Sequence, residues 1–478
     1  MSVLSAGLFQ RIESAPAVVA TNSETAKFLT FWFVLAAALL GAAVAINDGR
    51  LHWLGLQWLA LAILAMAGSM VLCRGRMVRF ASPRLIDAAM IAVIAFQIAH
   101  LLLVGPLTTA ETSLPFGALA GCLGVMTAGI GLARFSRFLV AGSGLIVGGF
   151  AVLGWSTIWT SPDVRIDVLQ FQTEAASRVL DGGNPYATRY RNIYHPHTEF
   201  YGPGVVENGW LTFSFPYPPL SLLLVLPGQL LGDVRYAHLA AMTLAGLLLI
   251  LAGRNRCSIL AASLLLTSPR VPCVLSAGWT EPLLIFLAAG LLFLALRWRR
   301  GLWIGLGLLL AVKQYLVLLI PLTKLLGPTM GSRRGWRQMV LGAGLLALVA
   351  SVPYVAAEPR AAFRSLVQWQ LVQPFRYDAL SFAAMRGQLT GEESAGWAGF
   401  AAAALAISLG LWKAPRTPGG MMAAAGLLFV SFFALNKQAF CNYYLFVIGL
   451  CACAMVGFSG EVDSDVASAD RDVQRLTI

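Results

Sequence analysis

Apolar runs of about 17 to 21 residues recur along the whole chain, and they constrain its fold more than any other feature. A helix of this length crosses the hydrocarbon core of a bilayer. The 478 residues are 58% hydrophobic and 12% charged, about half the charged fraction of a soluble domain. The sequence therefore predicts an all-α polytopic membrane protein.

About twelve runs are predicted to cross the membrane completely. The first follows a short polar lead and precedes many others, so we expect a retained helix and not a cleaved signal. The predicted spans are 28–46, 52–72, 85–104, 115–133, 138–157, 236–253, 257–275, 281–297, 338–356, 396–413, 420–435 and 440–458.

Basic residues gather in the short connectors between these runs. Such connectors face the cytoplasm under the positive-inside rule, so both termini are predicted to be cytoplasmic and the protein multi-pass in the cell membrane. The net charge of +12 then points to lipid headgroups as the anionic partner and away from nucleic acid. The basic connector residues are Arg74, Arg76, Arg79, Arg84, Arg134, Arg137, Arg254, Arg256, Arg297, Arg299, Arg300, Arg333, Arg334, Arg337, Lys413 and Arg416.

A polar insert at 161–220 interrupts the apolar pattern and is predicted to lie outside, within a first outer loop at 159–218. Apolar residues recur every three or four positions from Asp167 to Leu180, which predicts an amphipathic helix on the outer membrane surface. The sequence Gly-Gly-Asn-Pro at 182–185 ends that helix. The rest of the insert is an aromatic loop, and a second outer loop is expected at 357–394.

Two later segments are not ordinary spans. The segment 219–231 is too short to cross and predicts a half-helix that returns to the same side. The run 302–326 is interrupted at Lys313-Gln314-Tyr315 and again at Pro321. It predicts a broken re-entrant helix pair that enters from the cytoplasm, with Lys313 near its buried turn.

The chain therefore divides into three regions. Residues 1–133 form an N-terminal four-span region without an assigned role, 134–458 form the main transmembrane region, and 459–478 form an acidic cytoplasmic tail that we expect to be disordered. The seven cysteines include no CxxC pair. Cys273 and Cys441 both fall near the predicted outer face, where a disulfide is one reading and buried small hydrophobic residues are the better one.

Asp167 is the first candidate for chemistry, with Asp163 as its rival. Both follow the fifth predicted span, and an ionised carboxylate there could act as a general base toward a hydroxyl group. The alternative for Asp167 is a structural residue that favours the helix dipole at a helix start.

Other polar residues have competing interpretations. His195 and His197 have side chains that bind metals, but no third histidine is nearby, so a solvated loop is favoured and no metal is predicted. Glu281 opens a helix and is explained by capping. Lys313 at membrane depth marks either a functional cavity or a buried ion pair.

The start of the last span carries a further polar group that contains Lys437, Asn442 and Tyr443. A cation and phenols at this level could hold a lipid phosphate. The alternative is an aromatic and snorkelling belt at the headgroup level.

The pattern of Asp167, a helix, Gly182-Gly183-Asn184-Pro185-Tyr186 and Tyr217-Pro218-Pro219 resembles integral-membrane glycosyltransferases of the GT-C fold. It is most similar to the family 87 type, which depends on polyprenyl-phosphate mannose. The resemblance covers about residues 138–458, and four extra spans before the acidic loop depart from it.

The resemblance implies an inverting transfer of a mannose-like sugar, without a cofactor, from a polyprenyl-phosphate donor to a glycan or glycolipid acceptor on the outer face. Asp167 would be the base, with Asn184, Tyr186 and Tyr217 in the acceptor loop. The implied donor-binding residues are Lys313, Gln314, Tyr315, His195, His197, Glu281, Arg376, Lys437, Asn442 and Tyr443. A lipid or solute transporter or flippase, and a ligase for lipid-linked glycans, are the alternatives.

Overall fold

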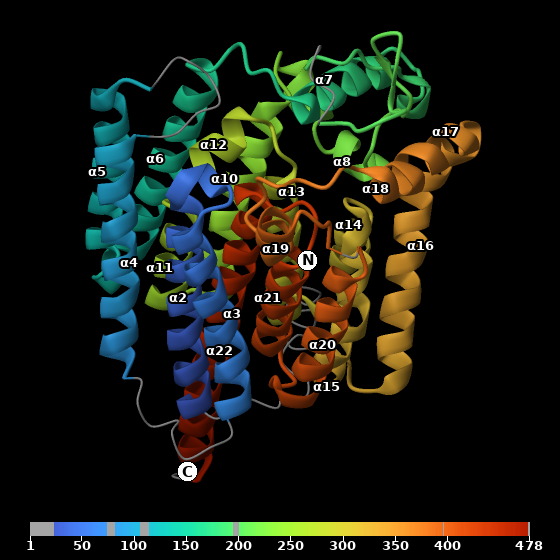
Figure 1. Ribbon diagram of the computed structural model, residues 1–478. Coiled ribbons are helices and arrows are strands. Elements are labelled where there is room, and N and C mark those ends of the chain that lie inside the picture. Colours follow the sequence, from blue (N-terminus) through green and yellow to red (C-terminus); the bar gives the residue numbers. More distant parts are fainter. Residues whose placement is uncertain (1–22, 74–81, 106–113, 195–199, 395, 477–478) are drawn as a thin grey trace, which may run out of the picture.

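The computed structural model describes residues 23–73, 82–105, 114–194, 200–394 and 396–476, and this part of the chain is mostly helical (Figure 1). The α-helices are α2 (Ser23–Ala45), α3 (Trp53–Leu72), α4 (Pro83–Val104), α5 (Phe116–Leu132), α6 (Leu139–Trp159), α7 (Asp167–Leu180), α8 (Pro219–Leu223), α9 (Leu226–Leu230), α10 (Arg235–Gly253), α11 (Arg256–Leu266), α12 (Val271–Ser276), α13 (Glu281–Arg297), α14 (Leu302–Leu310), α15 (Gly327–Met330), α16 (Arg333–Ala357), α17 (Pro359–Phe363), α18 (Trp369–Val372), α19 (Phe382–Thr390), α20 (Ala398–Lys413), α21 (Pro418–Ala434) and α22 (Cys441–Leu476).

Shorter elements join these helices. The 3₁₀ segments are η1 (Ile46–Gly49), η3 (Ser136–Phe138), η4 (Pro185–Ala187), η5 (Arg299–Gly301) and η6 (Gln314–Leu326), and η7 (Arg364–Gln368) is a π-helical turn. Strands β1 (Val206–Glu207) and β2 (Trp210–Leu211) pair antiparallel, with Val206 opposite Leu211. Asn208 and Gly209 between them both have positive φ, which is the geometry of a two-residue hairpin turn.

Seven helical segments in the described residues are long and apolar enough to cross a membrane. They are Ser23–Gly49, Trp53–Leu72, Pro83–Val104, Ser136–Trp159, Arg235–Gly253, Arg333–Ala357 and Cys441–Gly460. This supports the predicted all-α membrane class. The other predicted spans are represented by shorter helices (α5, α11, α13, α20 and α21), so the count of twelve stays a prediction.

Helix α22 forms the centre of the bundle and α16 forms its edge. Of the most apolar window in each helix, 94% is buried in α22 and 11% in α16. Helices α2, α13 and α21 pack around α22, whereas α16 stands at one side of the molecule, against α14 (Figure 1). The N-terminal helices therefore share the core of the main region.

Side-chain caps define where several helices begin. Ser82, Ser332 and Thr417 each have non-helical backbone angles and accept a hydrogen bond from a backbone N–H in the first turn. Asn255 and Ser258 form a reciprocal capping box at the start of α11. Such caps satisfy backbone donors that have no partner within the helix.

The predicted span 257–275 is not one continuous helix, because the chain breaks between α11 and α12. Arg270 lies in the break and is 1% exposed. Its guanidinium donates to the carbonyl oxygens of Val44 and Ala45, each at 2.8 Å, and pairs with Asp48 at 3.0 Å. The break thus places a cation where it can bind the end of α2.

The connection between α2 and α3 also joins the N-terminal region to the rest of the bundle. Leu51 N donates to Asp378 O at 2.8 Å, and Arg50 forms an isolated β-bridge with Ala379. Gly49 adopts φ +69° against Cys441, and a Cβ at Gly49 would lie 2.6 Å from Cys441 Cβ. Cys273 and Cys441 are free thiols.

The helix break at Lys313 is confirmed. Lys313 has extended angles between α14 and η6, and Pro321 lies inside η6. The chain then continues through α15, beside the start of α16 at the end of the bundle opposite α7 (Figure 1). Segment 219–231 forms the two short helices α8 and α9, as its length suggested.

The segment predicted as a second outer loop, 357–394, contains the short helical elements α17, η7, α18 and α19. The tail was expected to be disordered, whereas in the structure helix α22 continues to Leu476.

Candidate active site

Helix α7 begins at Asp167 and lies across the end of the bundle (Figure 1). Its buried Gln172 fixes its position, since Nε2 donates to Gly278 O at 2.6 Å and Oε1 lies 2.8 Å from His238 Nε2. On the same buried face, the ring of Phe171 packs against Tyr190 at 4.7 Å between centroids. Helix α7 is therefore held on the turn that leads into α13.

Asp167 is half-buried at the head of α7. Its Oδ1 accepts a hydrogen bond from Val168 N at 2.7 Å, and its own N–H donates to Tyr194 Oη at 3.1 Å. Tyr194 in turn packs on the fully buried Tyr201, with 5.7 Å between ring centroids. The carboxylate thus lies in a setting made largely of phenols.

Burial raises the pKa of the Asp167 carboxyl above its ordinary value. The Val168 N–H, the hydroxyls of Tyr194 and Tyr201 and the charge of Arg376 lower this pKa, but burial has the larger effect. A carboxylate in this state is a stronger base than an exposed aspartate. Asp163, by contrast, is exposed on the extended segment before α7.

A buried ion pair forms the second part of the site. Lys313 Nζ donates to Glu281 Oε1 at 2.6 Å and to Thr280 Oγ1 at 2.8 Å. Glu281 is completely buried and Lys313 is 6% exposed. Glu281 therefore does more than open α13, because its charge is the counter-ion of the cation at the helix break.

Three phenol rings surround the Lys313 ammonium group. The centroids of Tyr217, Tyr315 and Tyr443 lie 5.3, 5.6 and 5.5 Å from Nζ. Cations are attracted to the faces of such rings at this range. We call these three tyrosines with Lys313 the lysine cage.

Tyr217 connects Asp167 to the lysine cage. Burial raises the pKa of Tyr217 well above its ordinary value, and the charges of Asp167 and Glu281 act in the same direction, so Tyr217 lies within the electrostatic reach of both acids. The helix break after α14 is bonded to the loop segment that carries Tyr217, since Gln314 Nε2 donates to Pro216 O at 2.8 Å. Tyr217 is thus a member of the lysine cage whose hydroxyl is also influenced by the charge of Asp167.

Asn184 and Tyr186, expected in an acceptor loop, make structural bonds. Asn184 Nδ2 donates to Tyr354 O at 2.8 Å and its Oδ1 accepts from Tyr186 N at 2.9 Å. Tyr186 Oη donates to Tyr217 O at 2.9 Å. The Gly-Gly-Asn-Pro-Tyr and Tyr-Pro-Pro sequences are therefore bonded to each other.

The remaining predicted residues lie further along the same end. Arg376 makes two hydrogen bonds of 2.8 Å to Asp378, and Lys437 Nζ donates to Leu371 O and Gln373 O at 3.0 and 2.6 Å. Asn442 is buried in the first turn of α22. His195 and His197 lie outside the described residues. Within those residues, no group of three His, Cys, Asp or Glu side chains could hold a metal ion.

Sequence reasoning did not find Tyr194, Tyr201, Thr280 or Gln172. The two tyrosines stood in a loop already noted as aromatic, but only the fold shows which rings face Asp167. Comparison of the chain with protein-family models, with curated proteins and with solved structures finds no match.

Proposed function

We propose that this protein is a membrane glycosyltransferase that moves a mannose-like sugar from a polyprenyl phosphate to a glycan or glycolipid acceptor. One observation carries the proposal: a half-buried carboxylate of raised pKa, Asp167, shares Tyr217 with a caged lysine. A base can accept the proton of an attacking hydroxyl group, and cationic or hydrogen-bonding groups can stabilise a departing phosphate.

In the proposed reaction, Asp167 accepts the proton of the acceptor hydroxyl as its oxygen attacks the anomeric carbon. A new C–O bond forms, the bond from that carbon to the phosphate oxygen breaks, and the lipid phosphate leaves with the electron pair. The configuration at the anomeric carbon is inverted, because the displacement is direct.

The lysine cage would stabilise the charge that grows on the phosphate. The hydroxyl of Tyr315 is buried and makes no hydrogen bond within the described part of the chain, so it is free to donate one. Lys313 is already paired with Glu281. We therefore assign Lys313 the role of keeping the electrostatic potential around the three tyrosines favourable for a phosphate.

The topology that accompanies this function has about twelve crossings and a re-entrant pair at 302–326. The end that carries α7 faces outward, and both termini face the cytoplasm of a cell-membrane protein. This orientation rests on the basic connectors.

The test is sugar transfer in proteoliposomes supplied with radiolabelled polyprenyl-phosphate mannose or glucose and a glycolipid extract. Asp167→Asn should lower transfer by about 10²- to 10⁴-fold, the usual contribution of a general base. Asp163→Asn is the matched control, because it changes an exposed aspartate four positions away, and it should retain transfer. Equal activity of both variants would show that Asp167 is not the base.

A transporter or flippase is the second candidate, favoured by the helix break and its buried ion pair. It predicts movement of a fluorescent polyprenyl-phosphate lipid between leaflets without any change in its sugar. A glycan ligase would share the chemistry and would differ only in the donor.

A further inference from the structure

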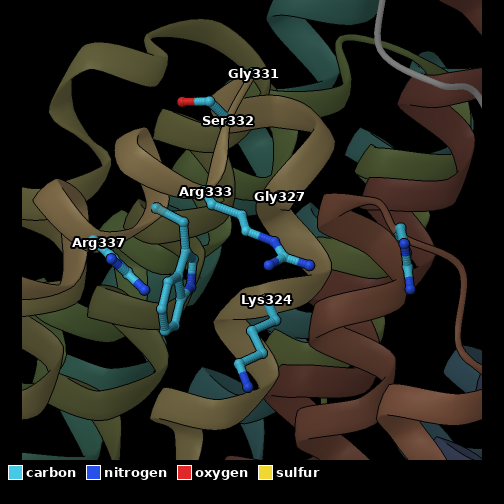
Figure 2. Close-up of a pocket in the computed structure, with 8 residues that line it drawn as sticks. Lys324, Gly327, Gly331, Ser332, Arg333 and Arg337 are labelled. Atoms are coloured by element: carbon cyan, nitrogen blue, oxygen red, sulfur yellow. The ribbon is translucent and has the colours of Figure 1, made fainter.

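A basic pocket lies at the end of the bundle opposite α7. It has a volume of about 660 Å³ and is bordered by the end of η6, the start of α16 and the connection between α20 and α21. Its charged lining residues are Lys324, Arg333, Arg337 and Arg416, and none of the lining residues is acidic. In Figure 2 the guanidinium of Arg333 lies above Lys324, with Arg337 at one side and Gly331 and Ser332 at the top.

These four cations are exposed, and among the described residues none of them has a carboxylate partner. Elsewhere in the described residues, the buried Arg235, Arg270 and Lys313 are each paired with an acid. None of the four pocket cations is in such an ion pair within the described residues. Four like charges around one concavity repel one another, and a bound anion would relieve this repulsion.

An aromatic residue completes the pocket. Lys324 Nζ lies 5.8 Å from the ring centroid of Trp336, and Trp336 Nε1 donates to Thr323 Oγ1 at 3.0 Å. The indole is thus fixed with one face toward a pocket cation. Tryptophan with lysine or arginine is the composition found at the headgroup level of membranes.

Helix α16 connects the pocket to the surface that faces lipid. Leu341, Leu345, Leu348 and Val352 follow Arg337 at steps of four, four, three and four residues, which places them on one helix face. They are 50–73% exposed. An acyl chain can lie along this apolar stripe while its headgroup occupies the pocket.

We propose that this pocket binds the phosphate groups of an anionic phospholipid, with arginine and lysine contacting the phosphates and the acyl chains lying along α16. A soluble phosphate compound would satisfy the cations equally well but would not use the stripe. Basic pockets between helix ends on the cytoplasmic side are suited to such headgroups. The site is separate from Asp167 and does not depend on the proposed transferase activity.

Native mass spectrometry of the purified full-length protein with cardiolipin, phosphatidylcholine or inorganic diphosphate tests this proposal. The protein should retain cardiolipin in preference to phosphatidylcholine. Arg333→Gln with Arg337→Gln should weaken cardiolipin binding by about 30-fold, since each removed cation contributes about fivefold.

The matched control is Arg134→Gln with Arg137→Gln, which removes two exposed arginines from a connector that does not line the pocket. This control should bind cardiolipin as the unmodified protein does. Equal loss in both double variants would overturn the pocket, because any basic connector would then serve. Diphosphate binding that competes fully with cardiolipin, at similar affinity, would overturn the lipid assignment. Melting temperatures in phosphatidylcholine nanodiscs check that both variants are folded.

Discussion

Lys313 Nζ lies 2.6 Å from Glu281 Oε1. The residue at the break between α14 and η6 therefore forms an ion pair with the first residue of α13. Both groups are almost completely buried. A buried pair of this kind contributes little net stability as a pair, but removing one partner leaves the other charge without compensation.

Lys313→Met should therefore lower the free energy of unfolding by about 3–5 kcal/mol. Replacing both residues, as Lys313→Met with Glu281→Leu, should restore most of this loss. Unfolding in SDS titrations would measure both effects. The exposed pair Arg386–Glu392 gives the control, since Arg386→Met should cost less than about 1 kcal/mol. A single Lys313 variant as stable as the unmodified protein would contradict this prediction.

The pH dependence of transfer should reflect the raised pKa of Asp167. A general base must be ionised, so transfer should fall as the pH drops through a value above the usual aspartate pKa of about 3.9. The Tyr194 hydroxyl lowers this pKa, so Tyr194→Phe should move the acidic limb of kcat/KM to higher pH. Tyr377→Phe changes an exposed ring and should leave the limb in place. An unmoved limb in the Tyr194 variant would count against Asp167 as the titrating group.

The same raised pKa has a consequence for stability. An acid whose folded pKa exceeds its unfolded pKa stabilises the fold at low pH, and this contribution is lost as the pH rises through the folded pKa. Asp167→Asn removes the penalty for an ionised group at neutral pH. The variant should therefore melt no lower than the unmodified protein at pH 7, whatever its activity.

Gln172 should be a positioning residue for α7. Gln172→Leu leaves Gly278 O and His238 without their partner, which should cost about 1–3 kcal/mol and reduce transfer. Gln170→Leu, which loses only a surface bond to Glu174, should cost about 0.5 kcal/mol or less. Thermal melting and transfer assays would compare the two, and similar losses would show that the buried amide has no special role.

A substitution at Gly49 would test the close contact between the N-terminal helices and α22. Gly49→Ala adds a Cβ 2.6 Å from Cys441 Cβ at positive φ, so the backbone must move. Gly182→Ala has a similar φ of +78° and no atom within 4 Å of the new Cβ, so it should cost only about 1–2 kcal/mol. Melting temperatures should fall further for Gly49→Ala, and equal falls would mean that the contact with Cys441 is loose.

Local patterns in the sequence were sufficient to predict helix α7 and the helix break at Lys313. Helix α7 has the predicted bounds because its apolar spacing and the Gly-Gly-Asn-Pro stop are local signals. The break at Lys313 was visible because a lysine and a proline interrupt an apolar run.

Contacts between distant segments were not predictable. Arg270 falls within the predicted span 257–275, and the carbonyl groups that bind it lie about 225 residues earlier in the chain. Likewise, the sequence shows Tyr194 only as one aromatic residue of a loop, and the fold is needed to show that its hydroxyl accepts a hydrogen bond from the Asp167 N–H. Periodicity describes single elements, whereas a site is made where several elements meet.

The helix type of segment η6 sets the distance between its two ends. Its 13 residues rise about 26 Å as a 3₁₀-helix and would rise about 20 Å as an α-helix. Lys313 stands before one end and Lys324 near the other. The 3₁₀ winding of η6 therefore holds the lysine cage farther from the basic pocket than an α-helix of the same length would.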